Sequence, residues 1–298
     1  MKKNTNENIL AIDIGGSTIK YAISTTSGDL IKKGNFPTPT SIEKMYEEFE
    51  KIFNSNKPLQ GIALSTPGSV DNKTGKISGS SAINYLHTHF IKNDLEHKFR
   101  TKISIENDAN CAALAEIWKG EAQNVEDCCL VVCGTGIGGA VVKGRKIHHG
   151  KNFHGGEFGY LILGLDEKEE PLMWSNIGST RNTIERVAKE IGKNVNELDG
   201  KEIFDNVDNN PVFKKHVEMF YKFMAIGIYN IQYVFDPEII IVGGAISKRR
   251  DLIENIYKFV DEYIKKLQVP KIKPIIKVCK FGNDSNLIGA VYNFLHSS

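Results

Sequence analysis

A short stretch near the N-terminus combines a carboxylate, two glycines, two hydroxyls and a lysine within eight residues: Asp13, Gly15, Gly16, Ser17, Thr18 and Lys20. Isoleucine-rich runs flank the glycines, as expected for two buried strands joined in a hairpin. The glycines allow a sharp turn and let a ligand approach backbone amides. These groups suit a metal-bound polyphosphate, with Asp13 holding Mg²⁺ directly or through water. A plain hairpin with a polar tip explains the same stretch.

A second carboxylate with catalytic potential is Asp108, which follows a predicted strand at 102–105 and precedes a predicted helix at 109–118. A carboxylate at such a junction can point into a cleft, accept the proton of an alcohol and orient its oxygen. The structural alternative is a helix N-cap, for which Asp is a favoured residue. From this pattern alone both interpretations stay open.

The length, composition and charge limit the classes of protein to which this chain can belong. The chain has 298 residues, which predicts two domains. Its 41% hydrophobic and 25% charged residues are typical of a soluble globular protein, and its net charge of +2 gives no basic footprint for nucleic acid. The polar segment Met1–Asn8 has no leader character and no run is long enough for a membrane, so we expect a cytoplasmic protein without a membrane partner.

Five cysteines lie mostly in apolar segments, which predicts buried free thiols in a reducing compartment. They are Cys111, Cys128, Cys129, Cys133 and Cys279. No CxxC pair occurs among them, which argues against a cysteine zinc site.

The elements that position these residues form a repeat. A strand, a glycine turn, a return strand, a turn and a third strand are predicted at 9–35 and again at 128–148. The second glycine turn, residues 134–139, has the sequence Gly-Thr-Gly-Ile-Gly-Gly. Two copies of one unit, each with a phosphate-type loop, predict two related domains that face one nucleotide. We expect the first domain to span 1–119 plus 285–298, with the last helix packing back on it, and the second to span 120–284.

The remaining pattern predicts further helices and strands. A helix capped by Ser41 is expected at 42–53, and a strand at 61–64 runs into a loop at 65–68. In the second half, helices are predicted at 180–193, 211–235, 250–267 and 286–295, and strands at 128–133, 140–143, 146–148, 238–242 and 274–281.

Six motifs, in order along nearly the whole chain, resemble those of the ROK family of sugar kinases, within the actin/hexokinase-like ATPases. They are DIGGSTIK at 13–20, STPG at 65–68, ENDANCAALAE at 106–116, GTGIGG at 134–139, GEFG at 156–159 and IVGG at 241–244. The resemblance implies an α/β fold of duplicated, ribonuclease H-like ATPase domains, two lobes with ATP and sugar in the cleft.

The resemblance also implies roles for individual residues. The ATP-binding positions are those of the first loop, Asp13, Gly15, Gly16, Ser17, Thr18 and Lys20, those of the second loop, Gly134, Thr135, Gly136 and Gly138, and Gly243 and Gly244 near the adenosine. Asp108 is implied to be the catalytic base. The implied sugar-binding positions are Pro67, Gly68, Asn84, Asn107, Asp108, Glu157, Tyr160 and Glu185, with Asn84 aligning poorly.

Two departures from the family pattern concern zinc. Zinc-containing members carry a cysteine cluster C-x-C-G-x-x-G-C-x-E, and the aligned stretch here, 176–185, keeps only the final glutamate, Glu185. The histidine that binds zinc and touches the sugar in those members is replaced by Tyr160. The chain therefore resembles the zinc-free branch, so ATP and Mg²⁺ are the expected cofactors and zinc is not. The loop from His148 to His154 is interpreted as a polar loop beside the sugar rather than a metal site.

The predicted function is an ATP-dependent kinase for the 6-hydroxyl of a hexose, a β-glucoside or an N-acetylhexosamine, in a homodimer. Glucose, β-glucosides such as cellobiose and N-acetylmannosamine all stay open. The alternative is a family regulator that binds a sugar or nucleotide without kinase activity. Family repressors carry a winged helix before the first phosphate strand, and only eight residues precede Ile9.

Overall fold

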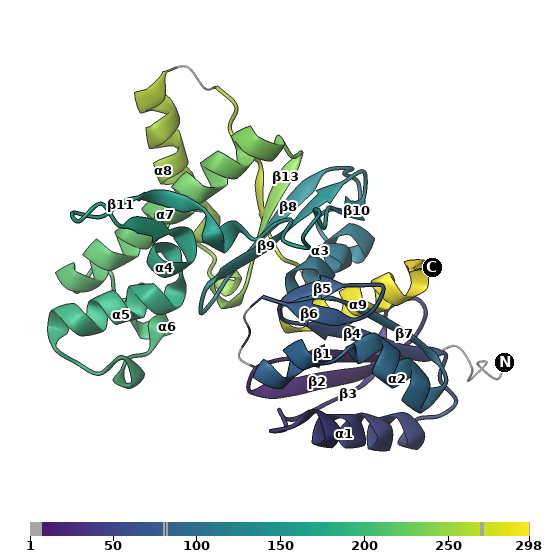
Figure 1. Ribbon diagram of the computed structural model, residues 1–298. Helices are drawn as coiled ribbons and strands as arrows, with labels where there is room; N and C mark the ends of the chain where they lie inside the picture. The colour runs from purple at the N-terminus through teal and green to yellow at the C-terminus, as the bar shows by residue number, and fades with distance from the viewer. Residues whose placement is uncertain (1–7, 80, 82, 269–270, 298) are drawn as a thin grey trace. The chain divides into compact units, whose positions relative to one another are not determined.

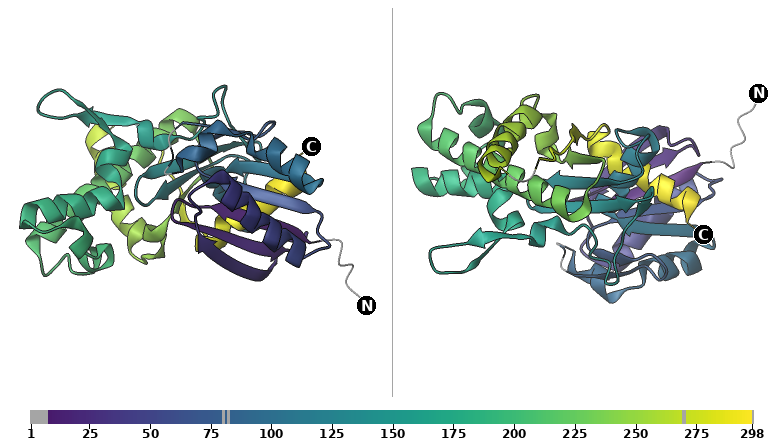
Figure 2. Two further views of the ribbon diagram at one scale, coloured as in Figure 1. Left: turned by 60° about the horizontal axis from the view of Figure 1, so that its bottom comes forward. Right: turned by 90° about the horizontal axis from the view of Figure 1, so that it is seen from above.

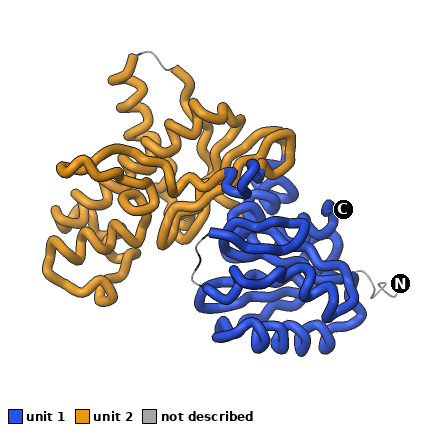
Figure 3. The backbone as a smooth tube through the Cα atoms, in the orientation of Figure 1, with its two compact units in different colours: residues 1–123, 149–155, 283–298 blue, residues 124–148, 156–282 orange. Residues whose placement is uncertain are grey.

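The computed structural model describes residues 8–79, 81, 83–268 and 271–297, so most of the polar segment Met1–Asn8 lies outside the described residues. The chain forms two compact units (Figure 3). Unit 1 comprises residues 1–123, 149–155 and 283–298, and unit 2 comprises 124–148 and 156–282. Within the described ranges, no helix has both the length and the apolar character needed to span a membrane.

Unit 1 is built on a five-stranded sheet with the order β3-β2-β1-β4-β7 (Figure 1). Its strands are β1 (Ile9–Ile14), β2 (Thr18–Ser24), β3 (Leu30–Pro37), β4 (Gly61–Thr66) and β7 (Lys102–Asn107). The first three form an antiparallel meander, and β4 and β7 continue the sheet in parallel with β1. A separate small hairpin joins β5 (Ser69–Asp71) to β6 (Lys76–Ser78). Side chains at the ends of β1, β4 and β7 therefore share one edge of the sheet.

Helices cover both faces of this sheet because successive strand residues point to opposite sides. In β1, Leu10, Ile12 and Ile14 pack in one core with α1 (Ile42–Ser55) and α2 (Ile91–Phe99). The alternate residues Ile9 and Ala11 pack with α3 (Asp108–Lys119) and α9 (Ser285–His296). The yellow helix α9 lies beside the strands of unit 1 in both views of Figure 2. The C-terminal helix thus belongs to the N-terminal sheet.

Unit 2 repeats this topology with the sheet order β10-β9-β8-β13-β14. Its strands are β8 (Cys128–Cys133), β9 (Ile137–Lys143), β10 (Lys146–Ile147), β13 (Ile239–Gly243) and β14 (Ile276–Val278). Again three antiparallel strands are followed by two that run parallel to the first. The internal repeat and the α/β fold class predicted from the sequence are confirmed.

The remaining elements of unit 2 are mainly helical. They are the hairpin of β11 (Ile162–Leu165) and β12 (Pro171–Met173), and the helices α4 (Trp174–Gly178), α5 (Thr180–Ile191), α6 (Gly200–Asp205), α7 (Pro211–Phe235) and α8 (Leu252–Leu267). Helix α7 begins as its sequence predicts, because Asn210 caps it and Pro211 occupies its first turn. The apolar residues of α7, with the fully buried Trp174, form the core of this unit.

Several predicted boundaries were wrong by a few residues. Strand β4 continues through Ser65 and Thr66, predicted as loop, because both pair in register with β7, at Glu106 and Asn107. Strand β9 begins at Ile137 rather than Ala140, because Gly138 and Gly139 also pair with β8. By contrast, β14 covers only three of the eight residues predicted at 274–281. The cysteines are free, as predicted, and four of the five are buried.

Candidate active site

Asp13 lies near the carboxyl end of β1 and is almost fully buried, with 7% of its surface exposed. Its Oδ1 oxygen accepts hydrogen bonds from the Ser65 hydroxyl at 2.8 Å and from the Asn286 amide at 3.1 Å. Its Oδ2 oxygen lies 3.9 Å from the Lys20 ammonium. A carboxylate fixed by partners from β4, α9 and β2 is held in one orientation. This arrangement of oxygen donors fits Mg²⁺ that keeps part of its water shell.

The hairpin tip between β1 and β2 is supported by the residue after β3. The Thr38 hydroxyl donates to the Gly15 carbonyl at 2.6 Å, and the Thr38 amide donates to the Ser17 carbonyl at 3.1 Å. Gly15 does not have a positive φ, so its backbone conformation is not what requires glycine at this position. A Cβ atom there would instead lie 2.6 Å from the Thr18 carbonyl oxygen. Glycine is needed because the chain approaches itself closely.

The second glycine loop, between β8 and β9, is held by the start of α5 and by α4. The Gly134 carbonyl accepts a hydrogen bond from the Thr180 hydroxyl at 2.6 Å. The Ile137 amide donates to the Ser175 hydroxyl oxygen at 3.0 Å, and a Cβ on Gly136 would lie 2.6 Å from that same oxygen. Thr135, at the loop tip, is exposed. The hydroxyls of Thr180 and Ser175 therefore support the backbone of this loop, while Thr135 at its tip is exposed.

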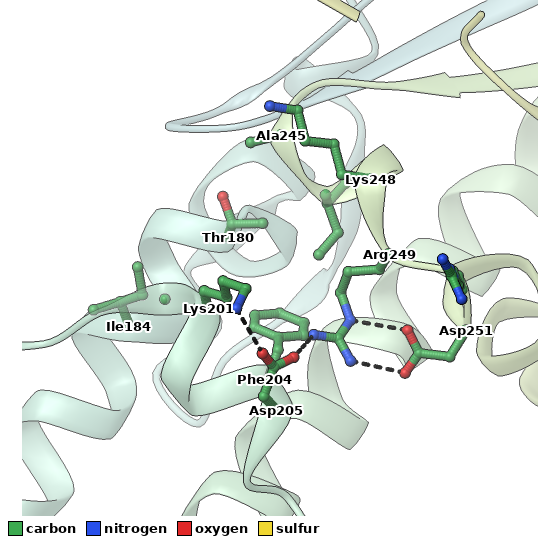
Figure 4. Close-up of a pocket in the computed structure, with 12 residues that line it drawn as sticks. Thr180, Ile184, Lys201, Phe204, Asp205, Ala245, Lys248, Arg249 and Asp251 are labelled. Atoms are coloured by element: carbon green, nitrogen blue, oxygen red, sulfur yellow. Dashed lines mark hydrogen bonds and ion pairs between the residues drawn. The ribbon is translucent and has the colours of Figure 1, made fainter.

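The turn after β13 adjoins this loop. Gly244 has φ of 90°, and a Cβ there would lie 2.1 Å from the Cys133 carbonyl oxygen, so only glycine fits. Gly243 pairs with Val132 of β8. The turn leads into the short helix Ala245–Lys248, which lines a cavity of about 860 Å³ (Figure 4).

The cavity lies within unit 2, between the starts of α5 and α6 and the segment 245–251. On one wall, the Arg249 guanidinium forms two hydrogen bonds of 2.9 Å to Asp251 and also pairs with Asp205 (Figure 4). The guanidinium lies 5.5 Å from the centre of the Phe204 ring. Apolar side chains such as Ile184 and Ile246 line the same space. A cavity with apolar walls and a fixed cationic plane suits a flat heteroaromatic base.

Asp108 is the first residue of α3, directly after β7. The N-cap is Asn107, whose Oδ1 accepts the Asn110 amide at 3.0 Å, so the interpretation of Asp108 as the cap was wrong. The Asn107 side chain also donates to the Gly68 carbonyl at 3.0 Å. Asp108 is half-buried. Its neighbour therefore caps the helix, while Oδ1 of Asp108 accepts the Ala109 amide at 2.8 Å.

Two residues beside this turn were missed as functional candidates. Glu106 is 1% exposed and accepts the His149 imidazole at 2.8 Å. His149 belongs to the segment 149–155, which lies in unit 1 although its sequence neighbours lie in unit 2. The sequence showed a histidine-rich loop there but carried no signal that would pair it with Glu106.

The other predicted sugar positions are divided between the two units. Pro67, Gly68 and Asn84 belong to unit 1 with Asn107 and Asp108, and Asn84 begins a short 3-10 helix with its side chain exposed. The remaining three belong to unit 2: the half-buried Glu157, Tyr160, which is 59% exposed, and Glu185, which pairs with Arg181 at 2.8 Å.

The stretch aligned with the zinc cluster of other members is an ordinary helix start here. Ser179 caps α5, and its hydroxyl accepts the Asn182 amide at 3.2 Å. Arg186 donates to the Ile177 carbonyl at 2.6 Å and thereby ties α5 to α4. Burial lowers the pKa of Arg186 to about 10. Across the described residues, no group of three or more His, Cys, Asp or Glu side chains is placed to hold a metal ion.

Comparisons with known proteins agree with this architecture. The chain is 33% identical over 291 residues to a β-glucoside kinase of Listeria monocytogenes, covering 96% of this chain and 97% of that protein. A ROK family protein from Streptococcus pneumoniae, solved in complex with sucrose, superposes with a TM-score of 0.90 at 34% identity, covering 97% of this chain and 98% of that one. A putative N-acetylmannosamine kinase from Listeria monocytogenes gives 0.87 at 31% identity, with the same coverage.

The sequence profile of the ROK family matches residues 9–296, nearly the whole chain. The similar folds and the duplicated sheets also agree with the actin/hexokinase-like fold inferred from the motifs. The chain therefore belongs to the ROK family.

Proposed function

We propose that this protein is an ATP-dependent sugar kinase that phosphorylates the 6-hydroxyl of a hexose, a β-glucoside or an N-acetylhexosamine. The observation that carries the proposal is the Asp108 carboxylate, on a turn whose cap and backbone are fixed by other residues. Relatives named for their activity, including β-glucoside kinases, favour a kinase over a regulator that binds without turnover.

In the proposed reaction, the sugar 6-hydroxyl attacks the γ-phosphorus of ATP. The new O–P bond forms as the bond from phosphorus to the bridging oxygen of ADP breaks, and the hydroxyl proton passes to Asp108. Asn107 and the backbone at Pro67 and Gly68 would orient the sugar, together with Asn84, Glu157, Tyr160 and Glu185. Carbonyl, amide and carboxylate groups of this kind match the donors and acceptors of a sugar ring.

The proposed nucleotide contacts come from both units. In unit 1, Asp13 would hold Mg²⁺ while the tip residues from Gly15 to Thr18, with Lys20, contact phosphate. In unit 2, the loop from Gly134 to Gly138 would supply amides to the phosphates, and Gly243 and Gly244 would lead to the base in the cavity beside Arg249. Bound Mg²⁺ would neutralise charge on the transferring phosphoryl group.

The direct test is phosphorylation of a panel of sugars with ATP, followed by NMR of the product to locate the phosphate. The panel includes glucose, cellobiose, N-acetylmannosamine and N-acetylglucosamine. We expect ADP release that depends on at least one sugar and a product phosphorylated at O6. ATP or sugar binding without turnover across the panel would favour the regulator instead. A homodimer stays a prediction.

Phosphoryl transfer is expected to require Mg²⁺ and no zinc. Asp13 supplies a hard oxygen ligand, whereas the stretch at 176–185 contains no thiol or imidazole for zinc. Treatment with EDTA followed by dialysis should abolish activity, and Mg²⁺ alone should restore it. Elemental analysis of the purified protein provides the second measurement: one zinc per chain would contradict the proposal.

A further inference from the structure

The buried carboxylate of Glu106 collects four hydrogen bonds from three separate segments of unit 1. Oε1 accepts the Asn107 amide at 2.7 Å and the Asn110 side chain at 2.9 Å. Oε2 accepts the Asn72 side chain at 2.5 Å and the His149 imidazole at 2.8 Å. A carboxyl group that is 1% exposed needs such donors, because burial of its oxygens without hydrogen bonds would be unfavourable.

Two of these hydrogen bonds come from the turn that carries Asp108. The Asn107 amide held by Glu106 belongs to the last peptide of β7, between Glu106 and Asn107, and Asp108 begins α3 directly afterwards. Asn110, which donates its side chain to Glu106, donates its backbone amide to the cap of the same helix. The position of the Glu106 carboxylate therefore sets the backbone that carries Asp108.

The segment 149–155, which contains His149, is itself fixed by hydrogen bonds at both of its ends. The Gly155 amide donates to the His149 carbonyl at 2.9 Å and closes the segment 149–155 into a loop. At the far end of that loop, the His154 imidazole lies 3.3 Å from the Ser69 hydroxyl, directly after Gly68. The loop thus contacts Glu106, which precedes Asn107, and Ser69, which follows Gly68, and Asn107 and Gly68 are themselves joined by a hydrogen bond.

We propose that Glu106 and His149 are positioning residues, which hold the Asn107–Asp108 turn so that Asp108 can accept the proton of the sugar hydroxyl. This inference rests on the proposed kinase function and adds to it a histidine supplied by a distant segment. Neither residue need touch substrate. Their effect is expected in the rate of the chemical step, because a small displacement of a base costs rate more than binding.

The charge on His149 gives the arrangement a pH dependence. The hydrogen bond to Glu106 raises the pKa of His149 above its usual value. Glu106 is the charged group in contact with the His149 imidazole, and the charges of Glu106, Asp13 and Asp108 all act on the Cys111 thiol of α3. Lys92 of α2 donates to the Asn72 carbonyl at 3.4 Å, and His154 of the same loop lies 3.3 Å from the Ser69 hydroxyl. Because the folded-state pKa is raised, the charge-assisted bond is fully present below the usual histidine pKa of about 6.5. It weakens as pH rises through the folded-state value.

The test compares His149→Leu, His149→Gln and the control His97→Leu, which makes the same change at an exposed histidine of α2. We expect kcat of H149L to fall about 10–100-fold with KM for ATP and sugar changed less than about 3-fold. H149Q, which keeps a neutral donor, should recover much of kcat and lose the alkaline decline that we expect of the parent. H97L should match the parent in rate and pH profile.

Hydrogen exchange supplies a readout that does not depend on activity. Amides at 106–110 should exchange faster in H149L than in the parent or in H97L, while melting temperature changes little. A parental kcat and parental exchange in H149L would overturn the positioning role even if the variant were less stable. An inactive parent enzyme would instead refute the kinase function, so the two failures are distinguishable.

Discussion

Replacing Asp108 by Asn is expected to lower kcat by about 10²–10⁴-fold with much smaller changes in KM, the range for a positioned general base. The substitution is nearly isosteric, so packing at the start of α3 should survive. The structure also removes a competing explanation, because the helix is capped by Asn107 and not by Asp108. Lost turnover in D108N would therefore not report a lost cap. Sugar phosphorylation and melting temperature should be measured on the same sample.

The matched control is Glu43→Gln, which removes an exposed carboxylate from the first turn of α1. Both substitutions remove negative charge near a helix N-terminus, where a carboxylate interacts favourably with the helix dipole. Only D108N should lose turnover. If kcat of D108N stays within a factor of about five of the parent, a loss far below that expected for a base, Asp108 is not the base.

The second large effect is expected from Gly136→Val, which should weaken ATP use by at least about 100-fold in kcat/KM, equal to the loss of one or two hydrogen bonds to a charged group. A Cβ at this position would lie 2.6 Å from the Ser175 hydroxyl oxygen. The valine must displace Ser175, which accepts the Ile137 amide at 3.0 Å, and the loop would lose its support. Gly136 has no positive φ, so the close approach to Ser175 is what requires glycine here.

The control for this variant is Gly164→Val in β11, where an added Cβ meets no atom within 4 Å. Titration with ATP and kinetics with a saturating sugar should separate the two variants. G164V should bind ATP like the parent, and G136V should not. Normal ATP affinity in G136V would mean that the second glycine loop is only a structural turn.

Local sequence patterns were sufficient for the fold class because the pattern is repeated. Alternating and continuous apolar runs with glycine turns occur twice in the same order, and both copies form the same five-stranded sheet. The long apolar pattern at 211–235, with Asn210 and Pro211 at its start, also defined α7 without help from its surroundings. Such signals are local, since they depend on neighbours within a few turns or strands.

Strand ends were less predictable, because pairing partners decide them. Ser65 and Thr66 have polar side chains and resemble a loop, yet β7 pairs with both and extends β4. The helix cap at Asn107 could not be told from one at Asp108, because both residue types cap helices equally well. Only the hydrogen bond to the Asn110 amide decided between them.

The sequence by itself determined that two related units each carry a glycine loop, that Asp13 lies at the end of a strand and that Asp108 follows one. Only the tertiary structure decided which groups form hydrogen bonds to Asp13 and to Glu106, the residue two positions before Asp108. Ser65 and Asn286 meet Asp13 from 52 and 273 residues away, and His149 meets Glu106 from 43 residues away. No local pattern encodes such pairs, because a single hydrogen bond has no periodicity in sequence and its partners meet only when β4, β7, α9 and the segment 149–155 pack together.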